Sequence, residues 1–279
     1  MKTLFRKNLL IVGIFLVSIS CTSSDPDVPG TGGQTGDDGL VTLPADKSFS
    51  LLSLSAARGL VSGSYDAGKL SGFIQDNNTD VIALQDVGYR TTESGGKDLV
   101  SEIAYKCSRN SQRRQGVFAS ISQTAEGEHG VAFLIRECFY GTRKLSLNGD
   151  LALLTIPYEL GSGEKVIIAT CQFDRESPDK RLKQAEALVA YADTVKQNVV
   201  IAASIHEKST GNVFSILNRK FRRSCKYSAD NTYPASQPTE RYDYILTPLS
   251  QNWGTQFVQM KGNGTISDHK AVFIRIGLK

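Results

Sequence analysis

Short apolar runs, separated by polar turn residues, recur from residue 48 to the end of the chain. They predict strands at residues 49–54, 81–84, 117–121, 131–135, 151–156, 166–170, 199–203, 242–246 and 271–276. Residues 180–195 instead place apolar side chains at helical spacing, and shorter helices are predicted at residues 69–76, 97–106 and 213–219. Because hairpins are mixed with helical crossovers, we predict an α/β fold, a two-sheet sandwich of mixed, mostly antiparallel sheets flanked by helices.

The N-terminus has the layout of a secretory signal. Lys2, Arg6 and Lys7 precede an apolar run at residues 9–19 that is too short to span a membrane, and Cys21 follows. A cysteine at the cleavage point resembles a bacterial lipoprotein signal, in which the thiol is acylated. The alternative is a plain signal peptidase site with an incidental cysteine. We expect an exported lipoprotein of the cell envelope, periplasmic or on the cell surface, that contacts the membrane only through its lipid anchor.

Three segments are therefore predicted. Residues 1–20 form a lipoprotein-type signal peptide, residues 21–47 a tether rich in Gly, Asp and Ser, and residues 48–279 one folded domain. Removal of residues 1–20 takes away three basic residues and no acidic ones, so the net charge falls from +4 to +1. Bulk charge therefore gives little support to nucleic-acid binding. The cysteines form no CxxC pair, which argues against structural zinc.

Polar and ionisable residues stand where several predicted strands end. They are Ser55, Asp86, Gln172, Ser204, His206 and Asp243, with Asp268 and His269 just before the last strand. Catalytic groups commonly sit where strand ends meet loops. We therefore expect these side chains to share one end of the sandwich.

The order of these motifs resembles the endonuclease/exonuclease/phosphatase superfamily across the whole predicted domain. The resemblance implies attack of water on a phosphodiester or phosphomonoester, assisted by a divalent cation, commonly Mg²⁺, and a histidine base. It places Asp86 and Asp268 on the metal side, His269 as general base, and Asp243 as the carboxylate that orients His269. Asp86 stands where the family has a glutamate, so its carboxylate is one methylene shorter.

Four positions depart from the family pattern. Ser55 replaces an asparagine, Gln172 replaces a phosphate-contacting histidine, and Ser204 and His206 replace an aspartate and an asparagine. Glutamine can hydrogen-bond but cannot carry a proton between pH 5 and 8. Loss of a single catalytic residue commonly costs orders of magnitude in rate. We therefore expect a ligand-binding relative whose phosphoester hydrolase site is impaired or lost.

The alternative is an active metal-dependent phosphodiesterase or phosphatase with an altered site. His206 and His269 would then converge with the carboxylates and favour Zn²⁺ or Mn²⁺ over Mg²⁺. The interpretation we favour for His206 is a surface loop residue after a strand, and for His129 a turn residue. The ligand class stays open between a phosphorylated small molecule, a lipid headgroup, a glycan and nucleic acid.

Overall fold

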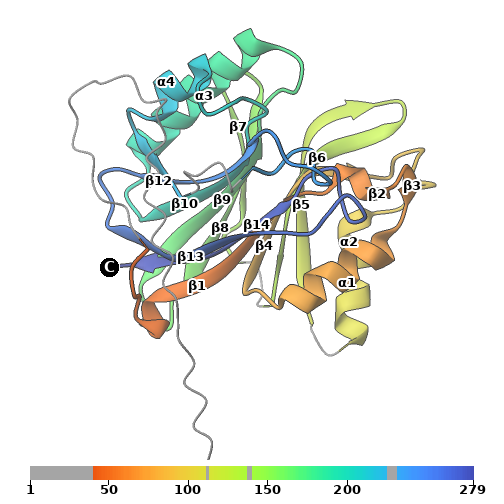
Figure 1. Cartoon of the computed structure of the whole chain (residues 1–279), viewed down its shortest axis with the longest axis horizontal. Helices are drawn as coiled ribbons and strands as arrows, with labels where there is room; N and C mark the ends of the chain where they lie inside the picture. Colours follow the sequence, from red (N-terminus) through yellow and green to blue (C-terminus); the bar gives the residue numbers. More distant parts are fainter. Residues whose placement is uncertain (1–39, 111–112, 137–139, 225–230) are drawn as a thin grey trace, which may run out of the picture.

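The computed structural model describes residues 40–110, 113–136, 140–224 and 231–279. These residues form two six-stranded sheets that stack face to face, with helices on both outer faces (Figure 1). This arrangement confirms the predicted α/β sandwich of mixed sheets. No helix among the described residues is long and apolar enough to cross a membrane.

The first sheet has the strand order β13–β14–β1–β4–β6–β5. Its strands are β1 (Ser48–Ser55), β4 (Val81–Tyr89), β5 (Gln115–Thr124), β6 (Gly127–Ile135), β13 (Trp253–Lys261) and β14 (Ala271–Leu278). β1 and β4 run parallel, and the other neighbours are antiparallel. Helices α1 (Ala67–Asn77) and α2 (Leu99–Arg109) cover its outer face, and the short hairpin of β2 (Leu60–Val61) and β3 (Ser64–Tyr65) precedes them (Figure 1).

The second sheet has the order β11–β12–β10–β9–β8–β7. Its strands are β7 (Arg143–Leu147), β8 (Leu151–Glu159), β9 (Lys165–Gln172), β10 (Val199–Ser204), β11 (Phe221–Arg223) and β12 (Asp243–Pro248). β9 and β10 run parallel, and α3 (Pro178–Thr194) and α4 (Asn212–Leu217) cover this sheet. Each sheet thus has one parallel pair at its centre. Ser55, Gln172 and Ser204 are the last residues of β1, β9 and β10, and Asp86 lies inside β4, three residues before its end.

Three apolar layers hold the sandwich together, one between the sheets and one under each helix pair. Neighbouring residues of a strand point to opposite faces. In β1, Leu51 therefore packs between the sheets and Leu52 packs under α1 and α2. Since the central strands are buried on both faces, they appear in the sequence as continuous apolar runs rather than alternating ones.

The strands that the sequence pattern missed lie at the periphery. β7, β11 and β13 are edge strands, and most of their residues are at least partly exposed. An edge strand needs fewer apolar residues because solvent or polar groups meet one side of it. The apolar-run criterion therefore found the centre of each sheet and passed over these edges.

The folded unit begins before Ser48. Leu43 is buried, and the backbone N–H of Val41 donates to the carbonyl of Thr255, which joins the chain to β13. The end of the predicted tether is thus packed on the domain. The predicted signal peptide, Cys21 and the tether before residue 40 lie outside the described residues.

Candidate functional site

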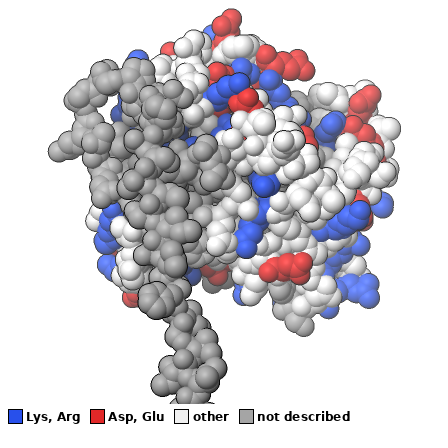
Figure 2. Space-filling view, viewed as in Figure 1, with Lys and Arg blue, Asp and Glu red and all other residues white. Residues whose placement is uncertain are grey.

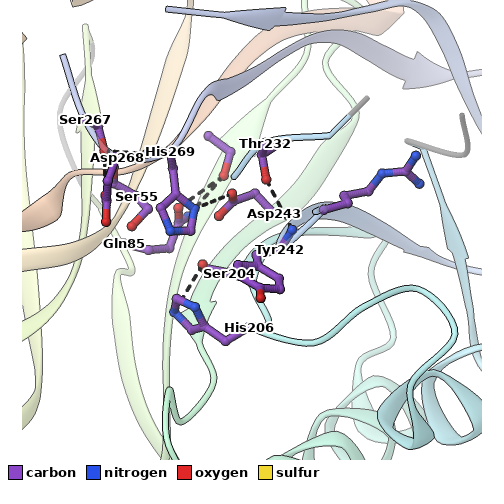
Figure 3. A network of polar contacts seen from close by, with 12 residues as sticks. Ser55, Gln85, Ser204, His206, Thr232, Tyr242, Asp243, Ser267, Asp268 and His269 are labelled. Carbon is purple, nitrogen blue, oxygen red and sulfur yellow. Dashed lines mark hydrogen bonds and ion pairs between the residues drawn. The ribbon is translucent and has the colours of Figure 1, made fainter. Parts of the chain in front are cut away.

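Asp243 and His269 form a buried hydrogen-bonded pair at one end of the sandwich (Figure 3). His269 Nδ1 lies 2.7 Å from Asp243 Oδ2, and the residues are 1% and 0% exposed. Burial alone would lower the pKa of His269, but the charge and hydrogen bond of Asp243, together with the charge of Asp268, raise it above its ordinary value. Burial raises the pKa of Asp243, but the charge and hydrogen bond of His269 outweigh burial, so this pKa lies below its ordinary value. The predicted proximity is present, and the pair can hold or move a proton at His269 Nε2.

A short turn before β14 presents His269 to the site. The Ser267 hydroxyl donates to the carbonyl of Ser55 at 2.6 Å and accepts the backbone N–H of His269 at 3.1 Å. On the other side, the Lys270 N–H donates to the carbonyl of Thr232. The turn is therefore fastened to the end of β1 and to residues 232–242, which fixes the direction of the imidazole.

Three of the four substituted positions, Gln172, Ser204 and His206, contact one another beside this pair. Ser204 Oγ and Gln172 Nε2 are 3.5 and 3.4 Å from His206 Nε2 (Figure 3 shows Ser204 and His206). The ring of His206 stands edge-on to that of His269, with centroids 5.8 Å apart. Burial lowers the pKa of His206 to about 3, so its imidazole is neutral at neutral pH. His206 lies in the loop that follows β10, but its ring is partly buried and contacts residues of the site.

Asp86 occupies a break in the ladder between β4 and β6. The register shifts between Leu84 and Val87, and Asp86 has a φ of +48°, in the left-handed region that few residues other than Gly, Asn and Asp adopt. Its freed N–H donates to Gln172 Oε1 at 2.7 Å. Gln172 therefore supports the backbone of Asp86, at a position where the family resemblance implies a residue that contacts phosphate.

Arg175, which the sequence analysis did not select, joins the two carboxylates of the predicted metal side. Its Nη1 lies 3.1 Å from Asp86 Oδ2, and its Nη2 lies 4.0 Å from Asp268 Oδ2. Arg175 follows Asp174 directly at the end of β9, and nothing in the local sequence pattern marks it. The structure thus brings Asp86 and Asp268 to one place, but with a guanidinium group between them.

The side chains present do not fit a divalent metal site of the family type. Mg²⁺ takes near-octahedral oxygen ligands at about 2.0–2.1 Å, and Zn²⁺ takes about four His, Cys or carboxylate ligands. The described residues include no group of three or more His, Cys, Asp or Glu side chains arranged to hold a metal. His206 Nε2 faces the side chains of Ser204 and Gln172, and His269 Nδ1 is taken up by Asp243, so neither of these two nitrogens is left for a metal.

A cleft of about 770 Å³ opens beside Asp86, Gln172 and Arg175. It runs between residues of β5 and β6 in one sheet and of β7 and β8 in the other. His129 also lines it, from within β6 opposite Gly88. The expectation that His129 is a turn residue was wrong, because the β5–β6 hairpin extends to residue 127, beyond the apolar run that predicted the strand.

No family model matches the sequence, and no curated protein matches it. Solved structures do. An endonuclease/exonuclease/phosphatase from Bacteroides vulgatus is similar over 83% of this chain and 99% of its own (TM-score 0.65, 12% identity). The catalytic domain of human Nocturnin with bound sulfate is similar over 84% of this chain and 94% of its own (TM-score 0.63, 11% identity). A mannosyl-6-phosphatase from Bacteroides thetaiotaomicron is similar over 82% of this chain and 99% of its own (TM-score 0.57, 11% identity).

These likenesses define the class of fold, the two-sheet α/β sandwich of endonuclease/exonuclease/phosphatase proteins. This chain has that fold across its described domain. The fold implied by the order of motifs in the sequence is thereby confirmed. The same fold hosts many activities, so the function must be argued from the site.

Proposed function

We propose that this chain is a divergent member of the endonuclease/exonuclease/phosphatase superfamily that binds a phosphorylated ligand, with phosphoester hydrolysis impaired or lost. The observation that carries the proposal is the buried Asp243–His269 pair, retained beside three substituted residues, Gln172, Ser204 and His206, that contact one another. The pair gives the site a group that can meet phosphate oxygens. The substitutions remove groups that the chemistry requires.

Hydrolysis needs an activated water and a group that neutralises charge on the phosphoryl oxygens. Ser204 is neutral where the family has an aspartate, and the pKa of His206, about 3, keeps its imidazole uncharged. Asp86 and Asp268 are joined by Arg175. Since losses in such a constellation commonly amount to several orders of magnitude, we infer that turnover is weak or absent.

Two buried polar atoms support ligand binding. Among the described residues, His269 Nε2 and Ser55 Oγ have no hydrogen-bond partner. Such atoms cost free energy unless a ligand or water satisfies them, and a phosphate has oxygens that can accept from both. Among proteins of similar fold, human Nocturnin has been solved with bound sulfate and another protein is a mannosyl-6-phosphatase, which supports a tetrahedral anion as the ligand group.

Surface charge favours a compact ligand. Among the described residues visible in Figure 2, acidic and basic side chains are interspersed and form no continuous basic track. Nucleic acid is held mainly through many phosphate contacts by Lys and Arg. A phosphorylated small molecule, glycan or lipid headgroup is therefore better supported than nucleic acid.

The test is calorimetric titration of the chain with mannose 6-phosphate and with mannose, in the absence of divalent metal. We expect saturable binding of the phosphate ester alone and at least about tenfold weaker binding after His269→Ala, since one charge-assisted hydrogen bond contributes about 1.5–3 kcal/mol. Lys165→Ala, an exposed change at the opposite end of β9, should leave the affinity unchanged. Equal affinities for the ester and the free sugar would contradict the proposal.

The intact pair also favours a second candidate, an active divalent-metal-dependent phosphodiesterase or phosphatase with an altered metal. Hydrolysis of p-nitrophenyl phosphate and bis-p-nitrophenyl phosphate, with Mg²⁺, Mn²⁺ or Zn²⁺ added, decides between the two. Turnover above the buffer rate that His269→Ala abolishes would establish the enzyme. Equal background rates with the wild-type chain and the variant would support the binding protein.

We further propose that Cys21 carries a lipid that anchors the domain to the cell envelope, on the grounds of the signal layout alone. Metabolic labelling with radioactive palmitate should mark the expressed chain. Cys21→Ser should abolish the label. Equal labelling of both chains would contradict the anchor.

A further inference from the structure

The Arg175 guanidinium lies where the family resemblance puts a metal. It pairs with Asp86 at 3.1 Å and reaches within 4.0 Å of Asp268, the two residues that the resemblance assigns to the metal side. The Asp86 side chain is only 8% exposed, so its carboxylate needs a cationic partner. Arg175 also lies close enough to both imidazoles that its charge helps to lower the pKa of His206 and opposes the rise in that of His269.

The loop that carries Arg175 is held from several directions. Asp174 Oδ1 accepts the N–H groups of Glu176 and Ser177, and its own N–H donates to Gln184 of α3. Arg181, 8% exposed, donates to the carbonyls of both Asp174 and Arg175. The backbone of Arg175 is therefore positioned by several hydrogen bonds, and its side chain, although 42% exposed, starts from a held loop beside Asp86.

We infer that Arg175 takes the place of the divalent cation in this site, so that the chain holds Asp86 and Asp268 together without metal. A guanidinium presents a planar fork of N–H groups that matches carboxylates, and it does not lose its charge at physiological pH. It supplies one positive charge against two carboxylates, where a divalent ion would supply two. A resident guanidinium thus satisfies the acidic residues but neutralises a phosphoryl group less well than a metal ion does.

The inference concerns the metal alone and is separate from ligand binding, so it is tested with Mn²⁺ and no ligand. Electron paramagnetic resonance counts free Mn²⁺ during titration of the wild-type chain, Arg175→Ala and Arg175→Lys. We expect weak, non-saturating binding by the wild-type chain and by Arg175→Lys, in which a cation still fills the space. Arg175→Ala should bind Mn²⁺ at least about tenfold more tightly, because it leaves a buried carboxylate with no cation nearby.

Controls separate this effect from general loss of positive charge. Arg58→Ala removes another guanidinium that lines the same cleft and pairs with Glu93, and it should leave Mn²⁺ binding unchanged. Asp86→Asn in the Arg175→Ala background should abolish the gain. The melting temperature of Arg175→Ala should rise with added Mn²⁺ and that of the wild-type chain should not. Tight Mn²⁺ binding by the wild-type chain that Asp86→Asn removes, or no gain in a folded Arg175→Ala chain, would overturn the inference.

Discussion

The hydrogen bond between Asp243 and His269 joins the two sheets of the sandwich. Asp243 opens β12 in one sheet, and His269 stands two residues before β14 in the other, yet their side chains meet at 2.7 Å with no appreciable exposure. The pair is therefore a structural clamp at the end of the fold as well as a candidate proton-handling group. A variant can lose stability and function together, and the two effects have to be measured apart.

Removal of the clamp should destabilise the domain strongly. Asp243→Ala leaves a buried imidazole without its partner, and we expect a loss of about 3–5 kcal/mol in the free energy of unfolding. Asp243→Asn keeps a hydrogen bond of lower strength and should cost less. Urea denaturation followed by circular dichroism measures both. Asp76→Asn, an exposed change on α1, should change the free energy of unfolding by less than about 0.5 kcal/mol. A loss as large as that of Asp243→Ala would contradict the role of the pair as a clamp.

Gln85 forms a second polar link between the sheets. It is fully buried, and its Nε2 donates to Thr170 Oγ1 of β9 at 2.9 Å and to Ser53 Oγ at 3.1 Å. Gln85→Leu leaves both hydroxyls without this hydrogen-bond partner and should lower the free energy of unfolding by about 2–3 kcal/mol. Thr170→Val should lower it by about 1 kcal/mol. Because the two residues share one interaction, the double variant should lose less than the sum of the single losses. Strict additivity in urea denaturation would show that the bond contributes nothing.

The fold was predictable from sequence because its central strands are buried on both faces. The apolar runs at residues 81–84 and 199–203 are typical of strands in the middle of a sheet covered on both faces, which is where they lie. The edge strands β7 and β13 were not predictable in the same way. Their side chains meet solvent on one side, so the sequence shows no run to count.

The sequence pattern selected the acidic and imidazole residues of the candidate site, and the structure places them close together at one end of the sandwich. Arg175 could not be predicted as part of the site, because its contacts with Asp86 and Asp268 depend on the conformation of a long side chain on a loop. Nor did the sequence indicate that Gln172 would accept the N–H of Asp86, since that contact requires the bulge in β4. Asp86 and Gln172 lie in different sheets, so their contact depends on how the two sheets pack, which local sequence patterns do not specify.

Arg181 should prove to be a positioning residue for Arg175. It donates to two loop carbonyls, and its Nε pairs with Glu207 at 2.9 Å. Arg181→Met keeps the stem but removes these bonds, and we expect a loss of about 2–4 kcal/mol in unfolding free energy, with Mn²⁺ binding raised as Arg175 loosens. Lys180→Ala removes an exposed charge from the same helix turn and should change stability by less than about 1 kcal/mol. A stable Arg181→Met chain with unchanged Mn²⁺ binding would exclude the role.

His206 should make the domain less stable in acid. Its pKa is about 3 in the folded chain, mainly because of burial, against an ordinary value of 6.5. Between these values the unfolded chain binds a proton that the folded chain does not, so stability is full above pH 6.5 and falls towards pH 3 by up to about 1.4 kcal/mol per pH unit. The raised pKa of His269 acts in the opposite sense, since its contribution is present below pH 6.5 and is lost as the pH rises through its folded pKa.

His206→Asn isolates the first effect, because asparagine does not titrate and accepts the left-handed backbone that His206 adopts at a φ of +53°. Unfolding free energies at pH 4.5, 5.5, 6.5 and 8 should fall less steeply with acid in the variant. The difference at pH 8, where both side chains are neutral, provides the reference. At pH 5.5, the difference in unfolding free energy between the variant and the wild-type chain should have moved in favour of the variant by at least about 1 kcal/mol from its value at pH 8. Parallel profiles would mean that His206 is protonated in the folded chain and reaches solvent.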